Sequence, residues 1–213
     1  MLKSQLDAFT KELLEDVGCD AEKLFAGQID QARKFRIPEL GLSVGASAPN
    51  FSLPDATGAT VELNRLMANG PVVLTFYRGG WCPYCNIQLR AYQGILNELK
   101  KLGASLVAVS PETPDNSLDT RQREELEFHV LSDNGNVVAK QFGLVFPVST
   151  EVRLLFEGWD INLENHNGIE GGEIPVPATY IIDEAATIIF GKPDVDYRTR
   201  VEPKEILRAL SSL

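Results

Sequence analysis

Two short apolar runs, at residues 72–77 and 106–109, enclose an amphipathic segment. Each run is apolar at successive positions, which is typical of a strand buried on both faces. Between them, apolar residues recur at helical spacing from Cys85 to Leu99, and Gly103 follows as a stop signal. The order strand, helix, strand predicts two parallel strands joined by a right-handed crossover. The chain should therefore form an α/β fold.

Two cysteines, Cys82 and Cys85, lie where the predicted helix begins, separated by Pro83 and Tyr84. Proline suits the first helical position because it has no N–H that needs a partner there, which places Cys82 at the N-cap. The unpaired N–H groups and the positive dipole end of a helix favour the thiolate, which is the reactive form of cysteine. The pair also follows the C-terminal end of the first predicted strand, which is where open α/β sheets place their sites. We expect a redox-active pair that closes a Cys82–Cys85 disulfide.

Three other interpretations of the pair are weaker. A structural disulfide across so short a loop would contribute only about 2 kcal/mol, and nothing in the sequence points to an oxidising compartment. A zinc site would need more ligands, but Cys19, His129 and His166 form no spaced pair, so we expect no metal. Inert buried cysteines fit poorly with the glycine and proline residues at this element boundary.

The composition restricts the partners. A formal charge of -10 and a pI near 4.7 disfavour nucleic acid and anionic membranes, which would repel the chain. We find no apolar run of transmembrane length and no continuous apolar stretch typical of a secretory signal near the N-terminus. We therefore expect a cytoplasmic protein without a cofactor, acting on small molecules or other proteins.

The first part of the chain, residues 1–41, has the pattern of a helical extension in front of a domain at 42–213. Gly18 and Pro38 are the expected helix stops, and Cys19 falls in the break without an assigned role. The apolar faces of these helices make a homodimer a reasonable prediction. Apolar residues recur at helical spacing in two stretches: Leu2, Leu6, Phe9, Leu13, Leu14 and Val17, then Leu24, Ile29, Ala32 and Phe35.

The rest of the domain reads as short strands and helices separated by turns. We expect a hairpin-rich segment at residues 42–63, a helix ending near residue 123 and a loop-like stretch at 157–177. Further elements are expected as a strand at 130–131, helices at 136–142 and 151–156, an antiparallel hairpin at 180–190 and a closing helix at 203–210.

Several separated motifs together resemble one family. They are APNFSLP at 48–54, FYRGGWCPYC at 76–85, SPETPDNS at 110–117, QFGLVF at 141–146 and PVPATYIID at 175–183. Over residues 42–213 the chain resembles the peroxiredoxins of the alkyl hydroperoxide reductase and thiol-specific antioxidant (AhpC/TSA) superfamily, and more closely a bacterial subgroup with a CPYC motif. The resemblance implies a thioredoxin-like fold, with a central mixed sheet flanked by helices, after an N-terminal helical extension.

The resemblance leaves open which sulfur reacts first. Peroxiredoxins carry a Pro-x-x-x-Thr-x-x-Cys motif, which places its cysteine on Cys85, its threonine on Cys82 and its proline on Arg78. The family's distal arginine falls near Pro177, where the sequence instead resembles the cis-proline loop of thioredoxins. The peroxiredoxin overlay nominates Cys85 as the attacking thiol. Thioredoxin geometry nominates Cys82, as the more exposed thiol at the mouth of the helix.

The resemblance implies a thiol-dependent peroxidase for hydrogen peroxide or organic hydroperoxides. One of Cys82 and Cys85 would form a sulfenic acid, the other would condense with it to a disulfide, and thioredoxin or a similar thiol would restore the pair. The alternatives are a thiol-disulfide oxidoreductase acting on protein disulfides, and a redox-sensing dimerisation or binding protein.

Three residues are expected to support the pair. Arg78 would lower a thiol pKa or stabilise the leaving hydroxide, although an exposed salt bridge is the commoner role of such an arginine. Trp81 would shield the site or fill the core. Pro177 would be cis and packed against the dithiol, or would form a plain turn. Arg198 and Arg200 could fold back towards the site, but the sequence gives them no catalytic role.

Overall fold

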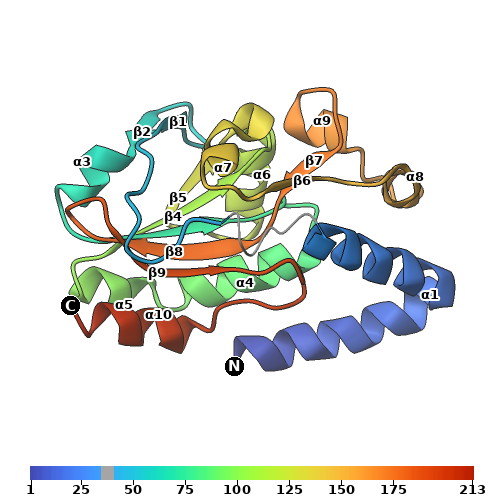
Figure 1. Cartoon of the computed structure of the whole chain (residues 1–213), viewed down its shortest axis with the longest axis horizontal. Helices are drawn as coiled ribbons and strands as arrows, with labels where there is room; N and C mark the ends of the chain where they lie inside the picture. Colours follow the sequence, from blue (N-terminus) through green and yellow to red (C-terminus); the bar gives the residue numbers. More distant parts are fainter. Residues whose placement is uncertain (35–40) are drawn as a thin grey trace.

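A five-stranded mixed sheet forms the centre of the computed structural model, which describes residues 1–34 and 41–213 apart from the side chain of Cys19 (Figure 1). The strand order is β5-β4-β3-β8-β9; β3, β4 and β5 are parallel to one another, and β8 runs antiparallel to both of its neighbours, β3 and β9. The expected parallel pair and closing hairpin are confirmed. The strands are β3 (Val72–Phe76), β4 (Ser105–Ser110), β5 (His129–Ser132), β8 (Ala178–Ile182) and β9 (Ile188–Pro193).

Helices cover both faces of this sheet. Figure 1 shows α4, α5 and α10 on one face, and α6 and α7 on the other. Their bounds are α4 (Pro83–Gln93), α5 (Leu96–Lys101), α6 (Pro114–Arg123), α7 (Val137–Gln141) and α10 (Pro203–Leu210), and the 3₁₀ turn η1 (Asn134–Asn136) precedes α7. All five strand positions of β3 are buried, as the apolar run predicted. The thioredoxin-like arrangement expected from the sequence is the observed one.

The helix expected from Cys85 to Leu99 is in fact two helices. α4 ends at Gln93 with Gly94 as its C-cap, and Ile95 has φ −109° and ψ 9°, outside the helical region. Glycine is a poor helix former, so the break falls where propensity is lowest. Leu99, on α5, is still fully buried, and the apolar stripe therefore continues across the break.

The stretch at residues 157–177 was expected to be loop-like, and this prediction was wrong. It contains α9 (Leu163–Asn167) and β7 (Glu173–Pro175), and β7 pairs antiparallel with β6 (Val145–Pro147). A three-residue strand has no local period to recognise, and its partner lies far away in the sequence. The expected hairpin and helix elsewhere are present as β1 (Ser52–Pro54), β2 (Thr60–Glu62) and α8 (Thr150–Glu157), with α3 (Leu63–Met67) following β2.

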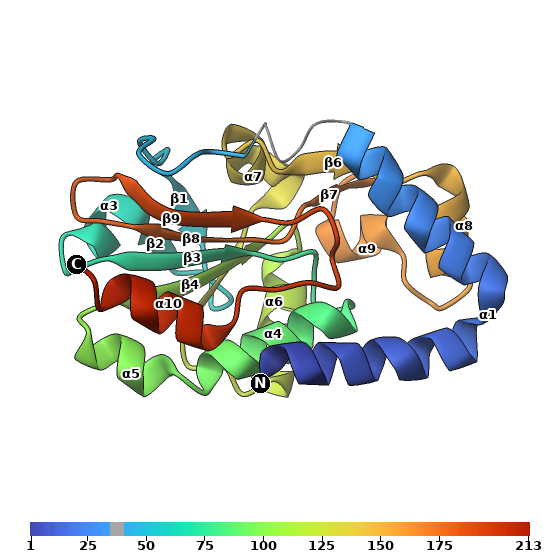
Figure 2. The same cartoon turned by 60° about the horizontal axis from the view of Figure 1, so that its bottom comes forward.

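The N-terminal extension is the long helix α1 (Leu2–Lys34), bent at Gly18, whose φ of 74° and ψ of 168° are not helical. We call residues 2–17 the first arm and residues 19–34 the second arm. Figure 2 shows the two arms as a V, with the first arm beside α4 and the second arm towards α8. The predicted stop at Gly18 is confirmed as a bend, whereas Phe35, Pro38 and the Cys19 side chain lie outside the described residues.

The extension packs on its own domain. Leu2, Leu6, Ile29 and Ala32 are buried in the same apolar cluster as the central sheet. These side chains therefore pack within the chain, while the homodimer and the boundary at residue 41 stay predictions.

None of the helices in the described ranges is long and apolar enough to cross a membrane.

Candidate active site

A glycine turn carries the chain from β3 into α4. Gly79 has φ 148°, and a Cβ built on it would lie 2.3 Å from Trp81 Nε1. A Cβ on Gly80 would lie 1.9 Å from Thr120 Oγ1, on α6. Neither position has room for a side chain, so the Gly-Gly pair lets this turn approach α6 closely.

Three polar side chains hold the backbone of Gly80. The N–H of Gly80 donates to Glu112 Oε2 at 2.8 Å, and its carbonyl accepts from Arg123 Nη2 at 2.8 Å and from Asn86 Nδ2 at 2.9 Å. Glu112 is almost fully buried, and its other oxygen lies 3.4 Å from His166 Nδ1. The sequence analysis missed Glu112, although a residue just after β4 belongs to the same sheet edge as the turn. His166, expected in a loop, lies in α9.

The helix begins as predicted, with Cys82 at the N-cap of α4 and Pro83 in its first turn. Both thiols are free, and both Cys82 and Cys85 have an exposed fraction of 0%. The expectation that Cys82 is the more exposed thiol was therefore wrong. The first arm of α1 packs against α4, and its Phe9 and Leu13 line a cavity together with Cys82.

Arg78 is buried beside Cys82 rather than exposed in a salt bridge. Its Nη2 lies 3.0 Å from Cys82 Sγ. Its guanidinium carbon is 4.0 Å from the ring centroid of Tyr197 and 5.1 Å from that of Trp81. Aromatic faces attract a cation, so the two rings hold the guanidinium against the sulfur. The structure thus brings Arg78 and Trp81 together with Cys82, and adds Tyr197, which the sequence analysis did not single out.

The two thiols have opposite shifts in pKa. Burial alone would raise the pKa of Cys82, but a hydrogen bond from the Cys85 thiol and the charges of Arg78 and Arg200 bring this pKa well below its usual value. Burial raises the pKa of Cys85, and its hydrogen bond to Cys82 and the negative charge there raise it further. This environment favours the thiolate form at Cys82 and the neutral thiol at Cys85.

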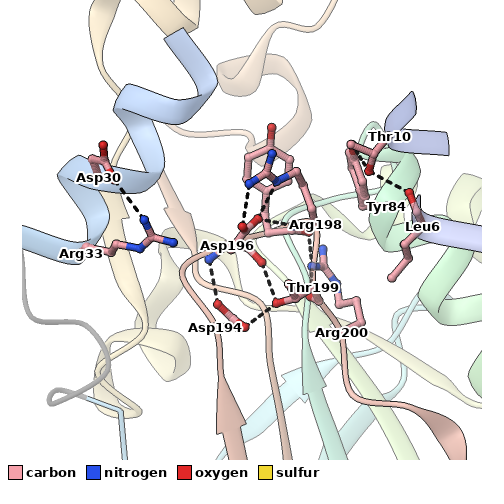
Figure 3. A network of polar contacts seen from close by, with 11 residues as sticks. Leu6, Thr10, Asp30, Arg33, Tyr84, Asp194, Asp196, Arg198, Thr199 and Arg200 are labelled. Carbon is pink, nitrogen blue, oxygen red and sulfur yellow. Dashed lines mark hydrogen bonds and ion pairs between the residues drawn. The ribbon is translucent and has the colours of Figure 1, made fainter. Parts of the chain in front are cut away.

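A second arginine lies near the other sulfur. Arg200 Nη2 lies 3.6 Å from Cys85 Sγ. Figure 3 shows how the segment carrying Arg200 is braced, because Asp196 accepts from Arg198 at 2.8 and 2.7 Å, and Asp194 pairs with Thr199. This arrangement orders the chain between β9 and α10. The sequence analysis noted that Arg200 could fold back, but had no local signal that it does.

Pro177 lies beside Arg200 on the wall of a cavity of about 270 Å³, which Gln88 and Thr179 also line. The part of the chain that the structure describes has no cis peptide bond, so the expected cis conformation of Pro177 was wrong. The backbone explains the difference, because Val176 N–H donates to Leu144 O and Pro177 O accepts from Asp194 N–H. These bonds keep the chain extended between β7 and β8.

No cluster of three or more His, Cys, Asp or Glu residues within 1–34 and 41–213 is arranged to hold a metal ion. The described site presents two neighbouring thiols with an arginine beside each. Such a group can attack an electrophilic atom and then close a disulfide.

Comparison with known proteins shows which proteins this chain is similar to. The profile of the AhpC/TSA family matches residues 44–190. Peroxiredoxin Q of Oryza sativa subsp. japonica, a chloroplastic protein, is 34% identical over 103 residues, which are 48% of this chain and 47% of that protein. Peroxiredoxin Bcp of Escherichia coli K12 is also 34% identical over 103 residues, 48% of this chain and 65% of that protein. The matched stretch spans about half the length of the first of these relatives.

Solved structures agree on the fold. The crystal structure of peroxidoxin BcpB from Mycobacterium tuberculosis superposes with a TM-score of 0.63 and 23% identity, covering 81% of this chain and 98% of that one. Peroxiredoxin Q of Xanthomonas campestris gives a TM-score of 0.61 at 16% identity over 80% of this chain and 96% of that one. The family profile covers most of the domain that carries the dithiol. The chain belongs to the AhpC/TSA family.

Proposed function

We propose that this protein is a thiol-dependent peroxidase in which Cys82 attacks the peroxide and Cys85 resolves the product. The observation that supports this most directly is the 3.0 Å contact between Arg78 Nη2 and Cys82 Sγ. A cation at this distance stabilises a thiolate, and the pKa of Cys82 is accordingly lowered whereas that of Cys85 is raised. The assignment to the AhpC/TSA family supports the reaction class.

In the first step the Cys82 thiolate attacks the terminal oxygen of the hydroperoxide. A sulfur–oxygen bond forms, the O–O bond breaks, and the leaving alkoxide or hydroxide takes up a proton to become an alcohol or water. The sulfur is oxidised to a sulfenic acid while the peroxide is reduced. Arg78 offsets the charge that develops on the leaving oxygen. Its two aromatic neighbours, Trp81 and Tyr197, keep it in place.

In the second step Cys85 attacks the sulfenic sulfur of Cys82. The sulfur–sulfur bond forms, the S–OH bond breaks, and the proton of Cys85 leaves with the hydroxyl group as water. The Cys85 thiol already hydrogen bonds to Cys82, so little rearrangement is needed. Fast resolution should also limit overoxidation to the sulfinic acid.

A reduced dithiol of the thioredoxin type then restores the pair by thiol–disulfide exchange. Its thiolate must reach a sulfur, yet both sulfurs have an exposed fraction of 0%. Reduction therefore requires the first arm of α1 to move away from the mouth of α4. A small peroxide can instead approach through the cavity that Cys82 lines. We place the cycle in the cytoplasm, in keeping with a free dithiol.

The same burial weighs against the two alternatives. A protein disulfide could reach Cys82 only after α1 had opened, so a general oxidoreductase of protein disulfides is the less suitable function. A redox-sensing binding protein would need the thiols to report on an exposed surface, which two fully buried sulfurs do not favour.

The test is NADPH consumption in the presence of thioredoxin and its reductase, with hydrogen peroxide or an organic hydroperoxide, beside an insulin-reduction assay. We expect peroxide-dependent turnover by the wild type, little insulin reduction, and no sustained turnover by either Cys82→Ser or Cys85→Ser. Brisk insulin reduction without peroxide turnover would instead establish the oxidoreductase. Partner binding that changes on oxidation, without turnover in either assay, would establish the redox sensor.

A further inference from the structure

A cavity of about 120 Å³ lies at the reactive thiol, and the N-terminal extension forms part of its wall. Phe9 and Leu13 come from the first arm of α1, and Phe25 comes from the second arm. Residues after β6 supply the opposite wall, with Phe156 on α8 and Trp159 just beyond it. The peroxide chemistry proposed above needs none of these five side chains.

The aromatic side chains of this wall contact one another closely. The ring of Phe25 lies 5.7 Å from that of Trp159 and 6.3 Å from that of Phe156, and Phe156 lies 5.2 Å from Trp81. Aromatic pairs at such distances hold one another in defined orientations. Residues from α1, from α8 and from the turn before α4 thus form one continuous apolar surface.

The lining has a distinct polarity. Arg78 and Cys82 lie at one end, and the remaining lining side chains in the described residues are apolar or aromatic. A water-filled cavity needs polar partners for its water, and this wall offers few. Hydrogen peroxide would use only the polar end. A molecule with a polar reacting group and an apolar body would use the whole site.

The size of the cavity restricts that apolar body. An apolar protein cavity of about 150 Å³ binds benzene, and this one has about 120 Å³. The space is slightly smaller than one that holds benzene, so a phenyl or short branched alkyl group is the largest apolar body it suits, and a long acyl chain exceeds it. Trp159, in the wall, is 37% exposed, so the lining reaches the surface of the protein there.

We propose that α1 completes a binding site for the hydrocarbon group of an organic hydroperoxide of aryl or short branched alkyl size, with Phe9, Leu13 and Phe25 as specificity-determining residues. The hydroperoxide group then lies at the Arg78 and Cys82 end. This inference rests on the proposed peroxidase function and assigns the N-terminal extension a role in choosing the substrate.

Direct binding tests the cavity without turnover. Both tryptophans of the chain, Trp81 and Trp159, line it, so intrinsic fluorescence reports on its occupancy. The probe is 2-phenyl-2-propanol, the alcohol formed from cumene hydroperoxide. We expect saturable fluorescence changes with the wild type, and weaker binding to Leu13→Gln, which places an amide in the apolar wall. The matched control is Leu154→Gln, because Leu154 is 61% exposed on α8 and is absent from the lining.

Kinetics with two peroxides test the specificity. We expect Leu13→Gln to lower kcat/KM for cumene hydroperoxide about tenfold or more, as loss of an apolar pocket contact does. Its kcat/KM for hydrogen peroxide should stay within about twofold of the wild-type value. For Leu154→Gln, the kcat/KM values for both peroxides should stay within the same range. An equal loss with both peroxides, or no binding of the alcohol to the wild type, would overturn the proposed cavity site but not the proposed peroxidase function. If neither peroxide is turned over, while the alcohol still binds the wild type and binds Leu13→Gln more weakly, the proposed function is overturned instead.

Discussion

Cys82 and Cys85 are separated by only two residues, yet their neighbours give them different chemistry. Arg78 contacts Cys82 at 3.0 Å, and Cys85 donates a hydrogen bond to the same sulfur. Arg200 lies 3.6 Å from Cys85. These contacts favour the thiolate at Cys82 and the thiol at Cys85, which is the division of roles that attack followed by resolution requires.

The change Arg78→Gln should raise the pKa of Cys82, since it removes the nearest positive charge. With the wild type, alkylation of Cys82 by iodoacetamide should fall only when the pH drops through the lowered pKa. In Arg78→Gln the alkylation rate at pH 7 should fall once this pKa exceeds 7, by about tenfold for each further unit towards 8.5, and should recover at alkaline pH. Mass spectrometry of the alkylated peptide measures the rate.

Arg65→Gln is the matched control for this prediction, because the Arg65 side chain is 79% exposed and pairs with Glu62 on the surface. Its pH profile should match that of the wild type. An unchanged profile for Arg78→Gln would show that Arg78 does not set the ionisation of Cys82.

At the scale of elements, the turn between β3 and α4 fixes where the helix begins. Glu112, after β4, and Arg123, on α6, both bind the backbone of Gly80. The N-cap position of Cys82 thus depends on three elements rather than on α4 alone. Gly80 is the closest point of contact, because a Cβ there would nearly coincide with the Thr120 hydroxyl.

Gly80→Ala should therefore lower the free energy of unfolding by about 1–3 kcal/mol through overpacking. Adding Thr120→Ala should restore part of the loss, since it removes the hydroxyl that the new Cβ meets. Gly27→Ala, in the second arm of α1 where a Cβ meets nothing within 4 Å, should instead raise stability by about 0.4–1 kcal/mol. Urea denaturation of the four proteins measures these changes, and a neutral Gly80→Ala would contradict the close approach.

The sequence predicted those elements whose signal is local. The closing helix at 203–210 starts at a proline and carries its own apolar period, and the strand at 72–77 is apolar at successive positions. Cys82 at the N-cap could be predicted for the same reason, because Pro83 marks the first turn. Local patterns also located the break at Gly18, where the glycine adopts a positive φ.

Contacts between distant segments could not be predicted in this way. Arg200 reaches Cys85 across 115 positions, and its placement depends on the braced segment after β9. Phe9 and Leu13 of α1 line a cavity with Cys82, and no pattern around Cys82 predicts that they lie there. The identity of the thiolate therefore required the structure, since it depends on which arginine is nearer to which sulfur.

On the scale of the whole molecule, hydrogen bonds tie both arms of the N-terminal extension, α1, to the rest of the chain. In the first arm, Thr10 shares a hydrogen bond of 3.0 Å with the Tyr84 hydroxyl (Figure 3), and in the second arm Gln28 donates to Pro147 O and accepts from Ser149 N–H. The extension lines the cavity at Cys82. Access of a protein reductant should therefore be coupled to opening of α1.

Leu6→Ala should make that opening easier, because Leu6 is buried in the first arm. Removing a buried leucine side chain costs about 2–5 kcal/mol of packing, and part of this loss falls on the closed state of α1. We expect faster reduction of the Cys82–Cys85 disulfide by thioredoxin than in the wild type, with a smaller change for dithiothreitol. Stopped-flow tryptophan fluorescence follows both reactions, and equal rates for Leu6→Ala and wild type with thioredoxin would contradict the coupling.

The most direct test of the assignment of Cys82 compares the two single cysteine variants with one equivalent of hydrogen peroxide and dimedone, which traps sulfenic acids. In Cys85→Ser the serine hydroxyl can still donate to Cys82, so we predict rapid labelling of Cys82, located by peptide mass spectrometry. In Cys82→Ser we predict slow labelling of Cys85, because burial keeps the pKa of that thiol raised. Rapid labelling of Cys85 in Cys82→Ser, with Cys82 unreactive in Cys85→Ser, would contradict the account.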